Sequence, residues 1–299
     1  MKVFILANDR YILHLLRFLA SAALFAPQFA ITLIPFNEDF SLCRRVAEVF
    51  GATIYDGDLQ TIDDFGRKLF DEKNTPQPPN PYALGKVRKL VILAASEPSL
   101  YLDLDLILTN DFRPICDWLQ TSKYGFAYYS ISRDWVYNDS DAGKELAAAS
   151  NLFATGFLAK GRIELSLASI CDKLLQAKEQ FHRVRKVGVV DQPLFNFLAD
   201  HLGVGPVHNI QKTLGLSAAV IPREGAHVRG DWSAWHKGLP VPFIHQPGDF
   251  RNDRRCRFLF DGMLAEGYKR ITKSDPELLR VLRQREVWTW RRMLNQIQT

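Results

Sequence analysis

Short apolar runs alternate with segments of helical periodicity at the start of the chain, and this alternation constrains the fold most. Residues 3–7, 29–35 and 52–55 are apolar enough to be buried strands. Residues 11–25 and 40–50 instead place their apolar side chains at helical spacing. Strands separated by helices pair in parallel and carry the helices on their faces. The sequence therefore predicts a doubly wound α/β domain.

The same alternation continues through most of the chain. Prolines at positions 76, 78, 79 and 81 predict a loop. Further strands are expected at 124–131 and 152–159, and further helices at 61–71, 82–95, 163–181, 191–202, 258–266 and 276–297. No glycine-rich phosphate loop of the G-x-G-x-x-G or G-x-x-x-x-G-K-[ST] type occurs, so a bound phosphate would depend on a metal ion.

Two aspartates interrupt the apolar run YLDLDLIL at 101–108. If one strand continued through Asp103 and Asp105, their carboxylates would share a face of the sheet. If the chain turns at Leu104, one carboxylate can face a ligand while the other reaches a metal. Two like charges among leucines are costly to desolvate without a cation, and a hard divalent ion is the natural one. The alternative is a pair of aspartates that caps the exposed end of a strand.

Composition restricts the class of protein. Hydrophobic residues make up 47% and charged residues 24% of the 299 residues, as in ordinary globular proteins with room for a sizeable core. The four cysteines form no C-x-x-C pair, so neither a zinc site nor a disulfide framework is expected. The apolar segments near the start are broken by polar residues, so we expect neither a signal peptide nor a membrane span. The sequence thus predicts a cytoplasmic protein.

Several short motifs occur in order along residues 1–251. They read NDRY at 8–11, GKVRKL at 85–90, YLDLD at 101–105, FATGFL at 153–158, VDQPLFN at 190–196 and HQPGDFR at 245–251. Together they resemble the retaining GT-A fold glycosyltransferases that include glycogenin and the bacterial lipopolysaccharide galactosyl- and glucosyltransferases. The resemblance implies an α/β fold with a mostly parallel central sheet flanked by helices. It also implies a hexosyltransferase that moves a hexose from a UDP-sugar to a glycan or lipid-linked acceptor.

The resemblance assigns nucleotide and metal contacts residue by residue. Asp9 and Tyr11 match residues that contact the uracil and ribose of the donor. Asp103 and Asp105 match the metal motif, and His245 matches the residue that completes the metal site. The implied ion is Mn²⁺ or Mg²⁺, which bridges the two phosphates of the UDP-sugar.

Basic residues that would contact the donor are assigned in the same way. Lys86, with Lys89 as a less favoured choice, matches the residue that contacts the donor sugar or its phosphates. Gly248 and Arg251 match a diphosphate-binding segment in which the family has lysine where this chain has Arg251. The proline that follows that lysine in the family is replaced by Asn252, so the resemblance does not establish that this loop closes as it does in the family.

The resemblance also indicates how the sugar is held. Asp191 would bind donor-sugar hydroxyls, and Gln192 would lie near the anomeric carbon. Gln192 is a poor nucleophile, so it would stabilise the oxocarbenium-like state of a front-face displacement rather than form a covalent intermediate. The family's asparagine in the FATG segment is Ala154 here, which weakens any sugar contact assigned to that side chain.

Other functions share parts of this pattern. A degenerate transferase would bind a nucleotide or glycan without turnover, and the altered motifs leave that alternative open. A phosphatase can also place Asp-x-Asp after an apolar strand, but that motif usually opens its domain, whereas here about a hundred residues precede it. Two of the candidate site residues could have a structural role instead, since Asp9 and Asp191 could each cap a helix.

The net charge of +5 belongs to the end of the chain. Residues 251–299 hold 12 of the 38 Lys and Arg but only 6 of the 33 Asp and Glu. We expect a catalytic domain at 1–257 and a basic, aromatic helical tail at 258–299. Such a tail suits peripheral contact with the inner membrane face, although it could instead pack its tryptophans on the domain. No nucleic-acid motif accompanies the charge, so no nucleic acid is expected as a partner.

Overall fold

The computed structural model describes residues 1–70, 81–131, 134–163, 166–201, 205–218, 225–245 and 254–297. The chain divides into two compact units, each built from segments that are distant in the sequence. Unit 1 comprises Met1–Leu6, Tyr55–Asp103 and Arg113–Ala218. Unit 2 comprises Ala7–Ile54, Leu104–Phe112 and Ala219–Thr299.

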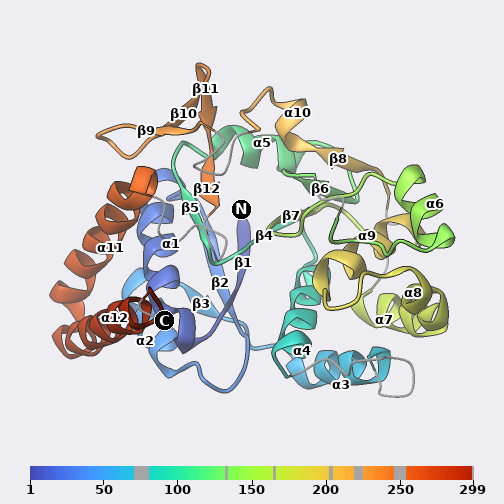
Figure 1. Cartoon of the computed structure of the whole chain (residues 1–299), viewed down its shortest axis with the longest axis horizontal. Coiled ribbons are helices and arrows are strands. Elements are labelled where there is room, and N and C mark those ends of the chain that lie inside the picture. The colour runs from blue at the N-terminus through green and yellow to red at the C-terminus, as the bar shows by residue number, and fades with distance from the viewer. Residues whose placement is uncertain are drawn as a thin grey trace. The chain divides into compact units, whose positions relative to one another are not determined.

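The sheet of unit 1 is mostly parallel. In spatial order its strands are β1 (Lys2–Ala7), β4 (Ser99–Leu102), β7 (Phe157–Lys160), β6 (Phe126–Tyr128) and β8 (Val207–Asn209). β1 pairs in parallel with β4, and β6 pairs in parallel with β8. β7 runs antiparallel to both of its neighbours, β4 and β6 (Figure 1). The expected mostly parallel α/β sheet is confirmed, with β7 as the reversed strand.

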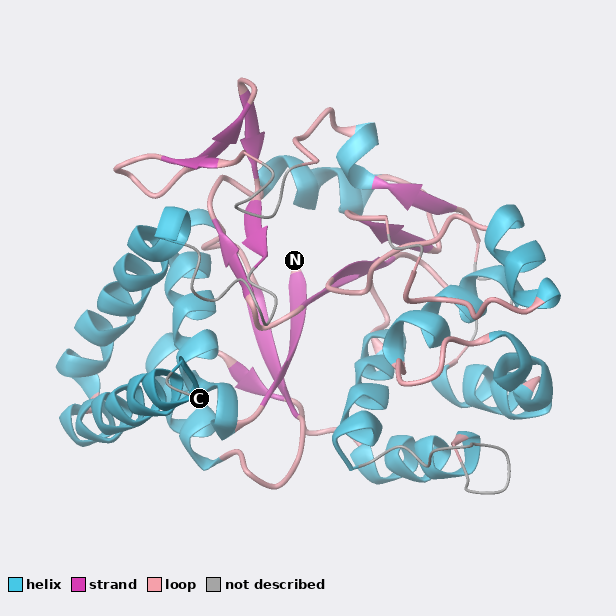
Figure 2. Cartoon of the chain, in the orientation of Figure 1, coloured by secondary structure: helices cyan, strands magenta, loops and turns pink. Residues whose placement is uncertain are grey.

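Helices fill the connections between these strands (Figure 2). They are α3 (Leu59–Leu69), α4 (Pro81–Val87), the 3₁₀ segment η2 (Arg88–Ala94), α5 (Arg113–Thr121), α6 (Asp141–Ala149), α7 (Leu167–Gln176), α8 (Lys178–Val184), α9 (Asp191–His201) and α10 (Ile210–Thr213). Side-chain caps set several starts: Asp58 accepts from the Thr61 amide, and Ser140 accepts from the Gly143 amide. The single helix expected at 82–95 is divided, because the backbone tightens to 3₁₀ geometry from Arg88 onwards.

Unit 2 contains short strands and several helices, of which α11 and α12 are the longest in the described structure. Its helices are η1 (Asp9–Tyr11), α1 (Ile12–Phe25), α2 (Ser41–Phe50), α11 (Arg254–Ser274) and α12 (Pro276–Ile297). Its strands are β2 (Ala30–Pro35), β3 (Thr53–Ile54), β5 (Leu106–Leu108), β9 (His227–Val228), β10 (Ala234–His236), β11 (Leu239–Val241) and β12 (Phe243–His245). β2 and β3 are parallel, whereas β5 with β12 and β9 with β10 and β11 are antiparallel.

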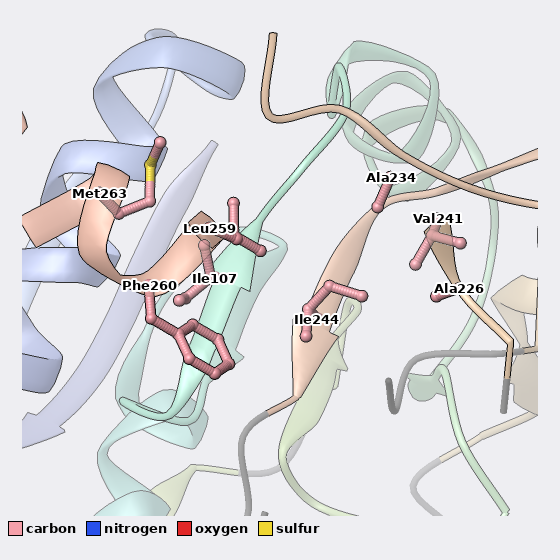
Figure 3. Packing of buried hydrophobic residues seen from close by; sticks show 8 residues of the cluster. All are labelled: Ile107, Ala226, Ala234, Val241, Ile244, Leu259, Phe260 and Met263. Carbon is pink, nitrogen blue, oxygen red and sulfur yellow. The ribbon is translucent and has the colours of Figure 1, made fainter. Parts of the chain in front are cut away.

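The C-terminal helices belong to the core of unit 2. Leu259, Phe260 and Met263 of α11 share one buried cluster with Ile107 of β5, with Ala226 and with residues of β10, β11 and β12 (Figure 3). α11 also packs against α1 and α2. The boundary expected between residues 257 and 258 therefore falls inside α11, and the helix is part of this unit's hydrophobic core.

Two further expectations can be compared with the part of the chain that is described. Cys43, Cys116 and Cys171 are buried free thiols. No helix within the described ranges is both long and apolar enough to cross a membrane.

Candidate functional site

The two aspartates of the YLDLD motif do not lie on one continuous strand. β4 ends at Leu102 and β5 begins at Leu106, so the chain turns through Leu104 between them. Asp103 belongs to unit 1 and Asp105 to unit 2. Of the two expected courses of the backbone, the chain thus follows the one that turns at Leu104.

Asp103 is held at the end of β4 by backbone and side-chain hydrogen bonds. Its amide donates to the Gly156 carbonyl at 2.8 Å, and the Tyr101 hydroxyl donates to its Oδ1 at 2.8 Å. A side chain at position 156 would meet the carboxylate, because a Cβ built there lies 3.0 Å from Asp103 Oδ2. The glycine of the FATG segment thus makes room for Asp103.

A buried lysine links Asp103 to a second carboxylate. Lys89 on η2 is 3% exposed, and its Nζ lies 2.9 Å from Asp103 Oδ1 and 2.5 Å from Asp191 Oδ2. The ammonium also lies over the Tyr101 ring, 4.5 Å from its centroid. Burial acts to lower the pKa of Lys89, but Asp103 and Asp191 outweigh it and raise that pKa well above its ordinary value. The ammonium is therefore charged, and it neutralises this cluster.

Asp191 stands at the first position of α9 and is itself buried. Its Oδ2 also accepts a hydrogen bond from the Thr155 hydroxyl at 3.0 Å, and Lys86 Nζ lies 3.6 Å from its Oδ1. Burial acts to raise the pKa of Asp191, but Lys89 and then Lys86 hold it below its ordinary value. Thr155 provides a hydroxyl beside Ala154, where the resembling family has an amide.

Gln192 follows Asp191 and presents an unsatisfied acceptor. Its Oε1 is buried and has no hydrogen-bond partner in the described structure. The start of α9 is fixed from within unit 1, because Asn196 donates to the carbonyls of Gln192 and Phe153 at 2.8 and 2.9 Å. A buried acceptor without a partner has a desolvation cost that a ligand donor would remove.

Asp105 and His245 come together in unit 2. β5 and β12 are antiparallel with His245 opposite Leu106, so the imidazole lies beside the end of the YLDLD motif. His245 Nε2 is 3.4 Å from Asp105 Oδ1. A carboxylate and an imidazole at this separation fit two positions of a Mn²⁺ or Mg²⁺ shell. No group of three His, Cys, Asp or Glu side chains within the described ranges is arranged around one metal position.

The carboxylate of Asp9 has a structural role at the N-terminus of α2. Its Oδ1 accepts from the Cys43 amide at 2.8 Å, and its Oδ2 accepts from the Leu42 amide at 2.9 Å and the Ser41 hydroxyl at 3.0 Å. The side chain is 1% exposed, so it is committed to the helix rather than open to a base. The base contact expected of Asp9 conflicts with this arrangement.

The neighbouring Asn8 was not selected from the sequence. Asn8 is 5% exposed, and its Oδ1 is buried without a hydrogen-bond partner in the described structure. It lies directly after β1, at the carboxyl end where α/β sheets bind ligands. The useful sequence signal was its place as the first polar residue after the strand. Tyr11 ends η1, and the guanidinium carbon of Arg10 lies 5.6 Å from the centroid of the Tyr11 ring.

The other expected donor contacts are Gly248, Arg251 and the two lysines. Gly248 and Arg251 lie outside the described residues. Of the two lysines, the structure brings Lys89 into direct contact with both carboxylates, whereas Lys86 approaches Asp191 alone. The preference for Lys86 over Lys89 is therefore not supported by the contacts.

Comparison with solved structures identifies proteins of the same fold. The galactosyltransferase LgtC, in a complex with donor and acceptor sugar analogues, is 15% identical, with 89% of this chain and 95% of that chain covered at a TM-score of 0.55. Mouse xyloside xylosyltransferase 1 is 12% identical, with 84% and 99% covered at 0.52. The glycosyltransferase GlyE of Streptococcus pneumoniae TIGR4 is 18% identical, with 91% and 63% covered at 0.51.

Comparisons by sequence are less informative. No protein-family model matches the chain, and no curated protein matches it either. The sequence identity to these solved structures is below 25%, so the likeness shows a shared fold. The chain has the fold of these glycosyltransferases, the GT-A fold that its sequence motifs led us to expect.

Proposed function

We propose that this chain is a metal-dependent glycosyltransferase that moves a hexose from a UDP-sugar to a glycan or lipid-linked acceptor, with retention at the anomeric carbon. The observation that carries the proposal is the pairing of Asp103 and Asp191 through Lys89 in unit 1. These residues come from two motifs far apart in the sequence, one expected at the metal and one at the donor sugar. The GT-A fold supports the same reading.

Asp103, Asp105 and His245 are the proposed ligands of Mn²⁺ or Mg²⁺. The carboxylates and imidazole are ligand types that these ions accept, and the 3.4 Å between His245 and Asp105 allows one ion to touch both. When bound, the ion supplies Lewis-acid stabilisation of the departing diphosphate. Lys86 adds positive charge next to Asp191, and Arg251 is the proposed diphosphate contact in the segment outside the described residues.

Asp191 and Gln192 are the proposed sugar-site residues. Asp191 remains ionised because its pKa is depressed, so it can accept hydrogen bonds from sugar hydroxyls. The buried Oε1 of Gln192 is an oriented dipole that can stabilise positive charge developing at the anomeric carbon. Neutral glutamine makes a front-face displacement preferable to a covalent intermediate.

Asn8 replaces Asp9 as the proposed contact to the base. An amide offers one acceptor and two donors, and the Oδ1 of Asn8 is the buried acceptor without a partner in the described structure. Oδ1 can accept from an imide N–H of uracil while Nδ2 donates to an adjacent carbonyl oxygen. Tyr11 remains the proposed contact to the nucleoside.

A thermal-stability panel tests the function. UDP-, GDP- and ADP-sugars are added to the full chain with and without Mn²⁺, and Asp105→Ala is measured beside the native protein. A ligand that binds only the folded state stabilises it by about 2.7 kcal/mol at one hundred times its Kd. We expect UDP-sugars to stabilise the native protein only with Mn²⁺, and Asp105→Ala to lose that response while remaining folded.

The panel, together with assays of UDP-sugar hydrolysis and of phosphate release, separates the alternatives. Equal UDP binding by Asp105→Ala with Mn²⁺ would contradict the metal assignment. If UDP stabilises the protein and no UDP-sugar is hydrolysed even slowly, the result would favour a nucleotide- or glycan-binding protein without turnover. Release of phosphate from small phosphoesters would favour the phosphatase.

A further inference from the structure

The Lys89 ammonium contacts both carboxylates on which the proposed function depends. Its side chain is 4% exposed, and it reaches Asp103 Oδ1 at 2.9 Å and Asp191 Oδ2 at 2.5 Å. The Tyr101 ring also lies next to the ammonium, with its centroid 4.5 Å from Lys89 Nζ. The cluster holds its own cation before any ligand arrives.

This cation bears directly on metal binding at Asp103. The Oδ1 atom already receives the Tyr101 hydroxyl and the Lys89 ammonium. A divalent ion bound to the same carboxylate would lie within a few ångströms of a fixed positive charge that cannot move into solvent. Repulsion at such a site is several times stronger than in water, since the effective dielectric constant is about 20 rather than 80. The negative charges of a nucleoside diphosphate would offset that repulsion.

We propose that Lys89 is a positioning residue that holds Asp103 and Asp191 together and keeps the affinity for a free divalent ion low, so that the metal binds strongly only with the nucleoside diphosphate. The inference rests on the proposed function, because it takes Asp103 as a metal ligand and Asp191 as a sugar contact. Lys89 thereby couples the metal position to the donor-sugar position.

Lys89→Met tests this directly, because methionine keeps the length of the side chain and removes its charge. Binding of Mn²⁺ alone to the nucleotide-free full chain is measured by the electron paramagnetic resonance signal of free Mn²⁺. We expect Lys89→Met to bind Mn²⁺ about tenfold or more tightly than the native protein, and UDP to enhance Mn²⁺ binding less in the variant. A lysine that only stabilises the fold would lower the melting temperature and leave Mn²⁺ affinity unchanged, which would overturn the proposal.

Arg88→Met is the matched control. Arg88 lies one residue away on η2 and pairs instead with Asp63 at 2.6 Å, so its loss removes one charge without touching Asp103. We expect it to bind Mn²⁺ as the native protein does. An equal gain of Mn²⁺ affinity in Arg88→Met would show a general charge effect and overturn the role given to Lys89.

A second comparison covers the case in which Lys89→Met does not fold. Lys89→Met combined with Asp191→Asn removes one cation and one anion, and it is compared with Asp191→Asn alone. Tighter Mn²⁺ binding by the double variant supports the proposal, and equal binding overturns it. If Mn²⁺ with UDP fails to stabilise the native protein, the proposed function and this inference both fall. If the native protein responds but Lys89→Met gains no Mn²⁺ affinity, the Lys89 inference alone falls.

Discussion

At the scale of single residues, the charges of unit 1 are buried in a mutually dependent group. Lys89 and Asp191 are 3% and 5% exposed and contact each other directly. Removing one member of a buried ion pair costs about 3–5 kcal/mol, because the partner remains desolvated and uncompensated. The depressed pKa of Asp191 adds stability above its unfolded pKa of about 3.9, and this contribution is lost as the pH falls through the folded pKa.

Asp191→Asn should therefore lower the free energy of unfolding by about 3 kcal/mol at pH 7. The difference from the native protein should stay constant down to about pH 5 and narrow toward pH 3, as the unfolded native chain takes up the proton. Urea unfolding at several pH values measures it, with the exposed Asp172→Asn as a control expected to be near neutral. A difference that does not change between pH 5 and pH 3 would contradict the depressed pKa.

Asp9→Asn tests the structural role of the neighbouring carboxylate. The substitution removes the charge and one acceptor from a group that receives two amides and a hydroxyl at the start of α2. We expect a loss of about 2 kcal/mol in unfolding free energy, with little change in UDP affinity. Asp39→Asn is the control, since its side chain is exposed. A large loss of UDP affinity without a loss of stability would return Asp9 to the base site.

Gln192→Ala tests the sugar site separately from the nucleotide. An interaction realised mainly in the transition state should cost transfer about 100-fold or more in kcat, while UDP affinity stays within about threefold. Steady-state kinetics and UDP titration of the same preparation provide the comparison. A parallel loss of UDP binding would place Gln192 at the nucleotide.

At the scale of elements, close approach of α1 and α11 holds unit 2 together. Gly267 on α11 faces the buried Leu16 on α1, and a Cβ built on Gly267 lies 2.5 Å from Leu16 Cγ. The two helices also lie side by side in Figure 1. The missing side chain therefore sets how closely these helices pack.

Gly267→Ala should destabilise the protein by about 1–3 kcal/mol, because the new methyl group overlaps a side chain that cannot move away. Gly66→Ala is the matched control at a helical glycine of α3, where the nearest atom to the new Cβ lies 3.4 Å away. There the better helix propensity of alanine should leave stability unchanged or raise it by up to about 1 kcal/mol. Equal effects at both sites in urea unfolding would contradict close packing at Gly267.

At the scale of the whole molecule, contacts within unit 2 hold Asp275 and the first part of α12, up to Arg285, in place. Leu278 and Leu282 of α12 are buried, and Arg45 forms an ion pair with Asp275 at 2.8 Å. Arg285 donates to the Asp9 carbonyl at 2.9 Å, next to the proposed base contact. Truncation at Ser274 would remove these contacts, so a membrane test needs a shorter deletion.

A form ending at Glu286 retains those contacts and removes Trp288, Trp290, Arg291 and Arg292. We expect full-length protein to sediment with anionic vesicles and the shortened form to bind about tenfold or more weakly, since each cation near the surface adds about 1 kcal/mol. Neutral vesicles should retain neither form. Equal retention of both forms by anionic vesicles, or of neither, would exclude residues 287–299 as a membrane contact.

The sequence alone determined the class of fold and the motifs that carry the proposed chemistry, because strand and helix periodicities are local properties of the chain. Asp103, Asp105, Asp191, Gln192 and His245 were all selected from motifs read in order. These motifs do not show which of several neighbouring polar groups turns inward.

Tertiary structure decided those choices. Lys86 and Lys89 are three residues apart, and only the approach of β4 and the start of α9 shows that Lys89 joins Asp103 to Asp191. Asp9 and Asn8 are adjacent, and only the position of α2 shows that Asp9 accepts the amide hydrogen bonds of the helix terminus. The C-terminal helices are likewise part of unit 2 because α11 meets α1 across more than 200 residues of sequence. Such contacts depend on how distant segments pack together, so local propensity does not encode them.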